Sequence, residues 1–218
     1  MDHAPRLSGR RAQAARNDER ILAAARAVFG EDPSAPIAAV ADHAGVGISA
    51  LYRRYDGKEQ LLQQLALDGI RRYIERVEEA LASDADPWDA FVQFMRRSVD
   101  EGASSTTSRL AGTYTVTDEL HRQGRAVYEA AHRLLDRTKA AGALRDDIEV
   151  GDLTMLFEQL QAVRVADDER TATLRRRYLE LILEALRGDG RPPLPGPAPD
   201  WDELSARSAA VGGRPSSP

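Results

Sequence analysis

The 218-residue sequence contains no cysteine, and this absence excludes several classes of protein. Without cysteine there is no disulfide framework, no cysteine-based metal site and no thiol catalysis, and the interior of a cell is the expected location. Aromatic residues are scarce at 6%, while alanine, leucine and arginine recur throughout, which favours helix over strand. We therefore expect an all-α fold.

Long apolar runs are missing as well. No stretch is long enough to cross a bilayer, and the first ten residues, M-D-H-A-P-R-L-S-G-R, lack the apolar core of a signal peptide. The expectation is a soluble, cytoplasmic protein with no membrane partner.

The net charge of -5 by itself argues against a protein that binds nucleic acid, but the basic residues are unevenly distributed. Arginines outnumber acidic residues before Asn17, and Arg53, Arg54 and Lys58 form a second basic cluster. Much of the acidic charge follows later in the chain. A basic end on an acidic body is compatible with a regulator that contacts DNA with a minority of its surface.

The segment from Ile37 to Tyr55 contains the most informative motif. Apolar residues recur at helical spacing on both sides of the turn Gly45-Val46-Gly47, and Gly45 can adopt the positive φ that ends a helix. This pattern predicts a helix-turn-helix, which presents its second helix to the major groove of DNA. The alternative is an ordinary helical hairpin in a protein core.

The helical patterns and the breaks between them divide the chain into four parts. We expect a flexible basic arm, a helix-turn-helix DNA-binding domain, a helical ligand-binding and dimerisation domain, and a disordered Pro/Gly-rich tail. Their expected bounds are 1–16, 17–60, 61–187 and 188–218. The first helix is expected to run from near Asn17, a good N-cap, to Phe29; an earlier start is the alternative, because residues 12–15 are also good helix formers. A short helix is expected around Leu110.

Several segments of the first third of the chain share residues and spacing with one known family. They are Ile21-Leu22-Ala23-Ala24-Ala25 through Phe29, Val40-Ala41, Ala44-Gly45-Val46, Leu51-Tyr52, Tyr55, Lys58-Glu59 and Leu61-Leu62. At these positions the chain resembles TetR-family bacterial transcriptional regulators; the remainder matches only in helix order and length. The resemblance implies an all-helical homodimer with an N-terminal three-helix DNA-binding domain. The larger helical domain would enclose a small-molecule pocket.

The resemblance also assigns residues to DNA contacts. Tyr52 and Lys58 match positions that contact phosphates, and Arg53 is close to them. Arg54 is either a further phosphate contact or a solvated surface residue. The side chains that follow the N-cap Gly47 are small and carry few donors, so direct base reading is expected to be modest. The complete set is Arg10, Arg11, Gly47, Ile48, Ser49, Ala50, Tyr52, Arg53, Arg54 and Lys58.

Candidate ligand-binding residues are large apolar side chains together with two polar ones near helix boundaries. They are Phe91, Phe94, Met95, Leu110, Tyr114, His121 and Phe157, and a largely apolar inducer with one or two polar groups would suit them. Ordinary core packing is the alternative for each. The resemblance implies that the last two long helices pair with a second copy of the chain. The candidate dimer residues are Leu153, Phe157, Leu160, Leu174, Tyr178 and Leu181.

Together these features predict a ligand-responsive transcriptional regulator, a repressor that a small-molecule inducer releases from operator DNA. One alternative is a helical protein-interaction module without a DNA role, to which the run Arg175-Arg176-Arg177 would contribute a basic patch. The other is an all-helical enzyme. No two of the four histidines have the spacing of a helical metal site, and the serines at 104 and 105 lack the context of a nucleophile. No catalytic residue, metal or cofactor is therefore expected.

Overall fold

The computed structural model describes residues 5–101, 113–188, 190 and 192–212, with the backbone alone described for residues 5–15 and 208–212. The regular elements in these ranges are helices, and a single antiparallel bridge joins Leu144 to Arg187. The helices are α1 (Pro5–Glu31), α2 (Ile37–Ala44), α3 (Ile48–Tyr52), α4 (Lys58–Ala82), α5 (Pro87–Asp100), α7 (Asp118–Ala140), α8 (Val150–Ala162), α9 (Asp168–Leu186) and α10 (Trp201–Gly212). The predicted all-α fold is confirmed. The short helix expected around Leu110 lies outside the described residues.

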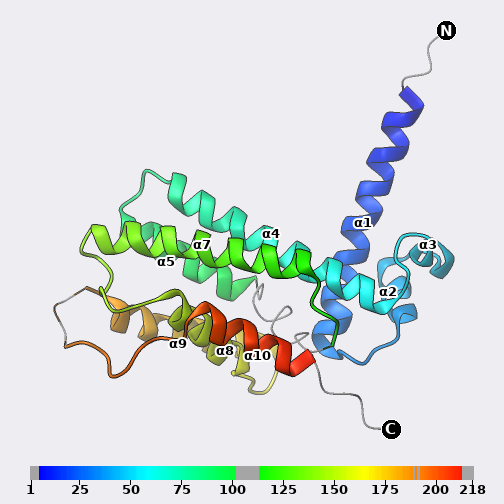
Figure 1. Ribbon diagram of the computed structural model, residues 1–218. Coiled ribbons are helices and arrows are strands. Elements are labelled where there is room, and N and C mark those ends of the chain that lie inside the picture. Colours follow the sequence, from blue (N-terminus) through cyan, green and yellow to red (C-terminus); the bar gives the residue numbers. More distant parts are fainter. Residues whose placement is uncertain (1–4, 102–112, 189, 191, 213–218) are drawn as a thin grey trace.

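Two hydrophobic cores form, and α4 belongs to both. The first core contains α1, α2, α3, Tyr114 before α7, Leu120 at the start of α7, and the N-terminal half of α4, which contributes Leu61 and Leu65. The second core contains α5, α7, α8, α9 and the C-terminal half of α4, which contributes Val77 and Ala80. Figure 1 shows α4 running from the small group of helices beside α1 into the larger group. A movement of α4 would therefore change the packing of both cores.

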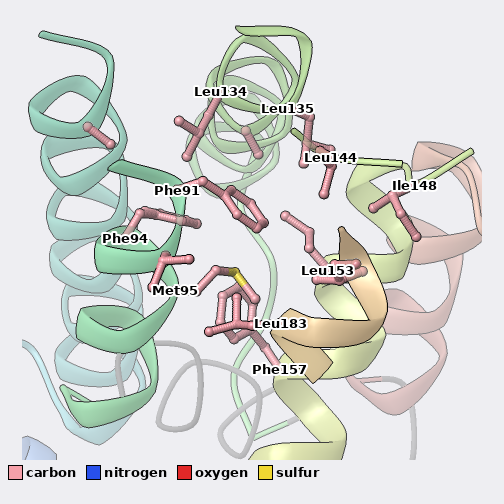
Figure 2. Packing of buried hydrophobic residues seen from close by; sticks show 14 of the residues in the cluster. Phe91, Phe94, Met95, Leu134, Leu135, Leu144, Ile148, Leu153, Phe157 and Leu183 are labelled. Atoms are coloured by element: carbon pink, nitrogen blue, oxygen red, sulfur yellow. The ribbon is translucent and has the colours of Figure 1, made fainter. Parts of the chain in front are cut away.

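The second core is built from side chains of five helices and of the loop before α8. Figure 2 shows Phe91, Phe94 and Met95 of α5 facing residues of α7, α8 and α9. The ring centroids of Phe94 and Phe157 are 6.4 Å apart in an edge-on arrangement. Burial of this apolar surface is the main force that holds the larger domain together.

The first helix begins before Asn17, which agrees with the alternative of an earlier start, and it begins even before residues 12–15. Helix α1 starts at Pro5, so the described part of the predicted flexible arm, residues 5–16, is helical. Asn17 lies inside the helix and is not its N-cap. Alanine, arginine and glutamine dominate residues 10–16, and these residues have high helix propensity, while proline is tolerated in the first helical turn. The basic residues before Asn17 therefore extend a helix, which projects from the molecule in Figure 1.

The prediction of a disordered tail is wrong for much of residues 188–218, because α10 packs against the larger domain. The ring of Trp201 lies 5.5 Å from that of His121 and 5.6 Å from that of Tyr128, centroid to centroid. Arg207 forms an ion pair with Glu158 of α8. Proline and glycine prevent a helical pattern in residues 192–199 but do not prevent that segment from packing, and Trp201 provides the apolar anchor.

The segment before α10 is held across α8 at a glycine. A Cβ atom added to Gly151 would lie 1.9 Å from the backbone oxygen of Pro199, which a side chain cannot tolerate. Gly151→Ala is therefore expected to displace the segment around Pro199 and α10 while the cores stay intact, at a cost of about 1–3 kcal/mol. Hydrogen exchange of residues 199–207 should become faster.

Gly30→Ala is the matched control, because a Cβ at Gly30 meets no atom within 4 Å. It should leave exchange in residues 199–207 unchanged. Equal exchange in the Gly151→Ala variant and the unaltered protein would show that α10 is not held in this way.

Candidate nucleic-acid interface

The turn between α2 and α3 is built from residues that can end one helix and start the next. Gly45 has a φ of 63°, and the N–H groups of Gly45 and Val46 donate to Asp42 and Ala41 at 3.1 and 3.0 Å. This left-handed conformation favours glycine. Arg20 of α1 donates to the carbonyl oxygen of Ala44 at 2.5 Å, which ties the end of α2 to α1. The predicted helix-turn-helix geometry is present, and the role of Arg20 was not signalled by the sequence.

Helix α3 has a buried side and an exposed side. Leu51 is fully buried, and Tyr55, which follows the helix, is 5% exposed. Ile48 and Tyr52 are 39% and 51% exposed, and Ser49 and Arg53 are also exposed. Because α3 has only five residues, its position depends on Leu51 and Tyr55, while Ile48, Ser49, Tyr52 and Arg53 face solvent. Gly47 is the N-cap, as predicted, and Ala50 is half-buried.

Of the basic residues near α3, Arg53 differs from the other two in its contacts. Within the described parts of the chain, no hydrogen bond or ion pair holds the Arg53 guanidinium or the Tyr52 hydroxyl. Both groups are therefore accessible to a phosphate.

Arg54 is engaged by α1. Its Nε and Nη2 atoms donate to the two carboxylate oxygens of Asp18 at 2.8 and 2.6 Å. The hydrogen bond and charge of Asp18 raise the pKa of Arg54, so its guanidinium stays charged in this pair. The Arg54 side chain is 61% exposed, which agrees with the alternative of a solvated surface residue, and its pair with Asp18 links α3 to α1. A phosphate contact by Arg54 would require this pair to open.

Lys58 is also held within the domain. Its Nζ donates to the carbonyl oxygen of Ala35 at 2.8 Å and lies 5.1 Å from the ring centroid of Phe29. Burial lowers the pKa of Lys58, and the charge of Asp32 partly opposes this. The side chain therefore fixes the loop before α2. The side chains of Arg10 and Arg11 lie outside the described residues, although their backbone is part of α1.

Four of the predicted ligand-binding residues come together, and two others do not. Phe91, Phe94, Met95 and Phe157 are packed in the second core and are at most 3% exposed. Tyr114 lies instead in the first core, and His121 is exposed on α7 beside Trp201. Leu110 is not among the described residues. A single pocket lined by the whole predicted set is therefore not what the fold produces.

The predicted dimer residues also fall into two groups, one buried and one at least partly exposed. Leu153, Phe157 and Leu160 of α8 are 2–3% exposed because they pack within their own subunit, so they cannot form an interface surface. Tyr178 and Leu181 of α9 are 43% and 61% exposed, and Leu174 is half-buried. The error arose because an apolar stripe shows that a helix face is covered but not what covers it.

Comparisons with known proteins agree with this geometry. Residues 21–65 match the family model of bacterial regulatory proteins of the tetR family, and residues 86–188 match that of the C-terminal domain of SbtR-like transcriptional regulators. The chain belongs to the TetR family. No curated protein sequence matches this TetR-family chain significantly.

Solved structures of other TetR-family regulators are similar to the chain over nearly their whole length. The regulator SCO0520 from Streptomyces coelicolor is 27% identical with a TM-score of 0.60, covering 78% of this chain and 98% of its own. A regulator from Mycobacterium vanbaalenii is 26% identical with a TM-score of 0.57, covering 81% and 98%. LfrR from Mycobacterium smegmatis, in complex with proflavine, is 20% identical with a TM-score of 0.58, covering 77% and 96%.

Membership of the TetR family makes the protein a DNA-binding transcriptional regulator and not an enzyme. In the described parts of the chain, no group of three histidine, aspartate or glutamate side chains is placed to hold a metal ion. None of the helices in those parts is both long enough and apolar enough to cross a membrane.

The start of α4 is bonded directly to the segment before α7 in this TetR-family chain. The backbone N–H of Thr115 donates to Glu59 at 3.1 Å, and Gln63 donates to the carbonyl oxygen of Thr115 at 3.0 Å. The hydrogen bond from Thr115 lowers the pKa of Glu59. Tyr114 and Leu120, on either side of this contact, are buried in the first core. The larger domain therefore reaches into the DNA-binding domain at this point.

A charged cleft of about 490 Å³ lies between α1 and α4, and no pattern in the sequence had indicated it. It is lined by Asp18, Glu19, Leu22, Arg26, Arg54, Tyr55, Gln60, Gln64, Asp68 and Arg71. Asp68 is 5% exposed, pairs with Arg71, and lies 3.5 Å from Arg26 and 3.4 Å from Arg72. Burial lowers the pKa of Arg26, as does the charge of Arg72, while Asp68 opposes both. This cluster braces α1 against α4.

Removing the carboxylate from the Arg54–Asp18 pair is expected to change DNA affinity and its dependence on salt. Asp18→Asn would release Arg54 toward the DNA side of α3, and operator affinity is expected to rise several-fold. If each subunit of a dimer gains one phosphate contact, the slope of log K against log salt becomes steeper by about 1.8. Fluorescence anisotropy with an operator duplex across a salt series measures both quantities.

Glu19→Gln is the control for this prediction, because Glu19 lines the same cleft and its loss removes the same negative charge. It should change affinity less and leave the slope almost unaltered. Identical behaviour of the two variants would mean that overall charge, and not the release of Arg54, controls binding.

Proposed function

We propose that this TetR-family protein is a homodimeric repressor that leaves its operator when it binds a small-molecule inducer. The observation that carries this proposal is the exposed side of α3, where Ile48, Ser49, Tyr52 and Arg53 face solvent while Leu51 anchors the helix. A short helix held in this way is suited to the major groove.

In our proposal the exposed residues of α3 have two different roles in DNA recognition. Tyr52 and Arg53 contact phosphates and set the position of the helix, because a hydroxyl and a free guanidinium are suitable phosphate donors. Ile48 lies near the base edges, where an apolar group can contact a thymine methyl but cannot read guanine. Lys58 supplies a phosphate contact only through the N–H groups that Ala35 does not use. Arg10 and Arg11, whose backbone belongs to α1, are proposed as further DNA contacts.

Dimerisation through α9 completes the proposed DNA-binding unit. Leu174, Tyr178 and Leu181 recur at helical spacing, and the last two are well exposed apolar side chains. An exposed apolar stripe on a helix supports pairing with the same helix of a second copy. The two recognition helices would then lie about 34–36 Å apart, or a multiple of this, to enter successive major grooves.

The proposed switch acts through α4. The hydrogen bonds between Thr115 and the residues Glu59 and Gln63 connect the start of α4 to the segment before α7. An inducer that binds one arrangement of the larger domain more tightly would shift α4 and change the spacing of the recognition helices. The structure of LfrR with proflavine supports a small molecule as the signal.

Selection from random duplexes with the purified full-length protein tests this function. A palindromic site is expected, bound by a dimer in sedimentation experiments, with an affinity that falls steeply as salt rises. A monomer that binds no duplex even at low salt would overturn the proposal. A dimer that binds DNA but activates transcription of a reporter would overturn only repression.

A further inference from the structure

Three side chains buried at one end of the second core carry polar atoms that have no hydrogen-bond partner among the described residues. Arg76 of α4, Ser98 of α5 and Gln161 of α8 are 3%, 1% and 6% exposed. Five of their buried atoms form no hydrogen bond with any described residue. They are Nε and Nη2 of Arg76, Oγ of Ser98, and Oε1 and Nε2 of Gln161. Buried polar groups are normally paired, so several unpaired groups together indicate that something else meets them.

The contacts of α9 place these side chains at the same level of the domain. Arg175 donates to the carbonyl oxygen of Gln161 at 3.0 Å, and its neighbour Arg176 donates to Asp100 at 2.6 Å. The C-terminal ends of α8 and α5 therefore meet at the start of α9. Arg76 donates through Nη1 to Glu101 at 2.6 Å, which brings α4 to the same end.

Aromatic side chains lie one helical turn from each of the unpaired groups. Phe94 precedes Ser98 by one turn on α5, and Phe157 precedes Gln161 by one turn on α8; Figure 2 shows both rings in the core. Tyr73 precedes Arg76 on α4, and its ring lies 5.4 Å from that of Phe94. The polar groups therefore border an aromatic region of the core.

Arg76 has one edge engaged and one edge free. Glu101 uses Nη1, while the N–H groups of Nε and Nη2 point in the same direction and have no acceptor among the described residues. This pair of parallel donors matches the two oxygens of a carboxylate. Burial lowers the pKa of Arg76 and the charge of Arg72 lowers it further, while Glu101 raises it. A second carboxylate beside Arg76 would compensate the buried charge more fully.

We propose that the effector of this regulator is a small carboxylate with an apolar body. The carboxylate binds the Nε and Nη2 edge of Arg76, with the hydroxyl of Ser98 and the amide of Gln161 as further partners. The apolar body lies against the rings of Phe94 and Phe157. The role as effector rests on the proposed function, whereas binding itself does not. A planar anion of one charge suits this place better than a phosphate dianion, because Arg76 already shares its charge with Glu101.

The experiment compares matched carboxylates and amides on the full-length protein. Butyrate, hexanoate and benzoate are titrated against butyramide, hexanamide and benzamide at constant ionic strength, with thermal unfolding and calorimetry as readouts. At least one carboxylate is expected to raise the unfolding temperature and to bind about tenfold or more tightly than its amide, a difference of about 1.4 kcal/mol. Equal binding within every pair, or no stabilisation by any carboxylate, overturns the proposal, and phenyl phosphate binding more tightly than benzoate overturns the choice of anion.

Variants test the position. Arg76→Lys keeps the charge but removes the two-donor edge, so it should weaken carboxylate binding about tenfold, whereas Glu101→Gln should strengthen it. Arg97→Gln is the matched control, because Arg97 lies 3.8 Å from the same Glu101 but is 53% exposed, and it should leave affinity within about twofold. Unchanged affinity in Arg76→Lys overturns the site. If that variant does not fold, the comparison of carboxylate with amide on the unaltered protein still decides.

Failure of this proposal and failure of the proposed function give different results. Binding of the carboxylate is measured without DNA, and operator binding is measured without the carboxylate. A protein that binds its operator but no carboxylate keeps the function and loses this inference. A protein that binds the carboxylate and remains on the operator loses inducer release, so the bound carboxylate is then not the effector.

Discussion

Leu51→Ala is expected to abolish operator binding while the larger domain stays folded. Leu51 is fully buried and is the one buried residue within the five-residue helix α3. Helices this short are not stable without tertiary contacts. Replacing a buried leucine with alanine costs about 2–5 kcal/mol, a large part of the stability of a small domain. Because α3 depends on this contact, its loss should unfold the recognition surface before anything else.

Leu135→Ala provides the matched comparison, since Leu135 is equally buried but belongs to the second core. Both variants should lower the unfolding temperature, and only Leu51→Ala should lose DNA binding at a temperature where helix content is retained. Hydrogen exchange should show protection lost in residues 37–55 for Leu51→Ala. Retained operator binding in that variant, or equal loss in both, would show that α3 is not held by Leu51 as described.

Arg53→Ala is expected to weaken binding to every DNA site by about tenfold or more at physiological salt. Arg53 is exposed and has no partner among the described residues, and a dimer presents two copies of it. Loss of two phosphate contacts should flatten the slope of log K against log salt by about 1.8. Since phosphates carry no sequence information, the preference among duplexes should be unchanged.

Arg54→Ala is the control for this prediction because it removes the same side chain from the next position. Arg54 is already paired with Asp18, so its loss should alter the salt slope little. Anisotropy titrations of both variants against two duplexes at several salt concentrations make the comparison. If Arg54→Ala flattened the slope as much as Arg53→Ala, the pairing with Asp18 would not persist on DNA.

Local patterns in the sequence predicted much of the fold. Apolar spacing in residues 37–44 and a glycine able to adopt positive φ at Gly45 are enough to specify the helix-turn-helix. Thr117 is the N-cap of α7, a position that threonine favours, and its side chain accepts a hydrogen bond from the N–H of Leu120 at 3.2 Å. These features depend on residues within one or two turns of each other, which is why the sequence alone was sufficient.

The sequence by itself therefore determined the all-α fold class, the turn between α2 and α3, and the resemblance to TetR-family regulators. Tertiary structure decided that Asp18 engages Arg54 and Ala35 engages Lys58, whereas Arg53 has no partner in the part of the chain that the structure describes. It also decided that Leu153 and Leu160 face inward while Leu181 faces solvent. The physical reason is that helical spacing fixes which residues share a face. What covers that face, and which charge finds a partner, depend on segments distant in the chain.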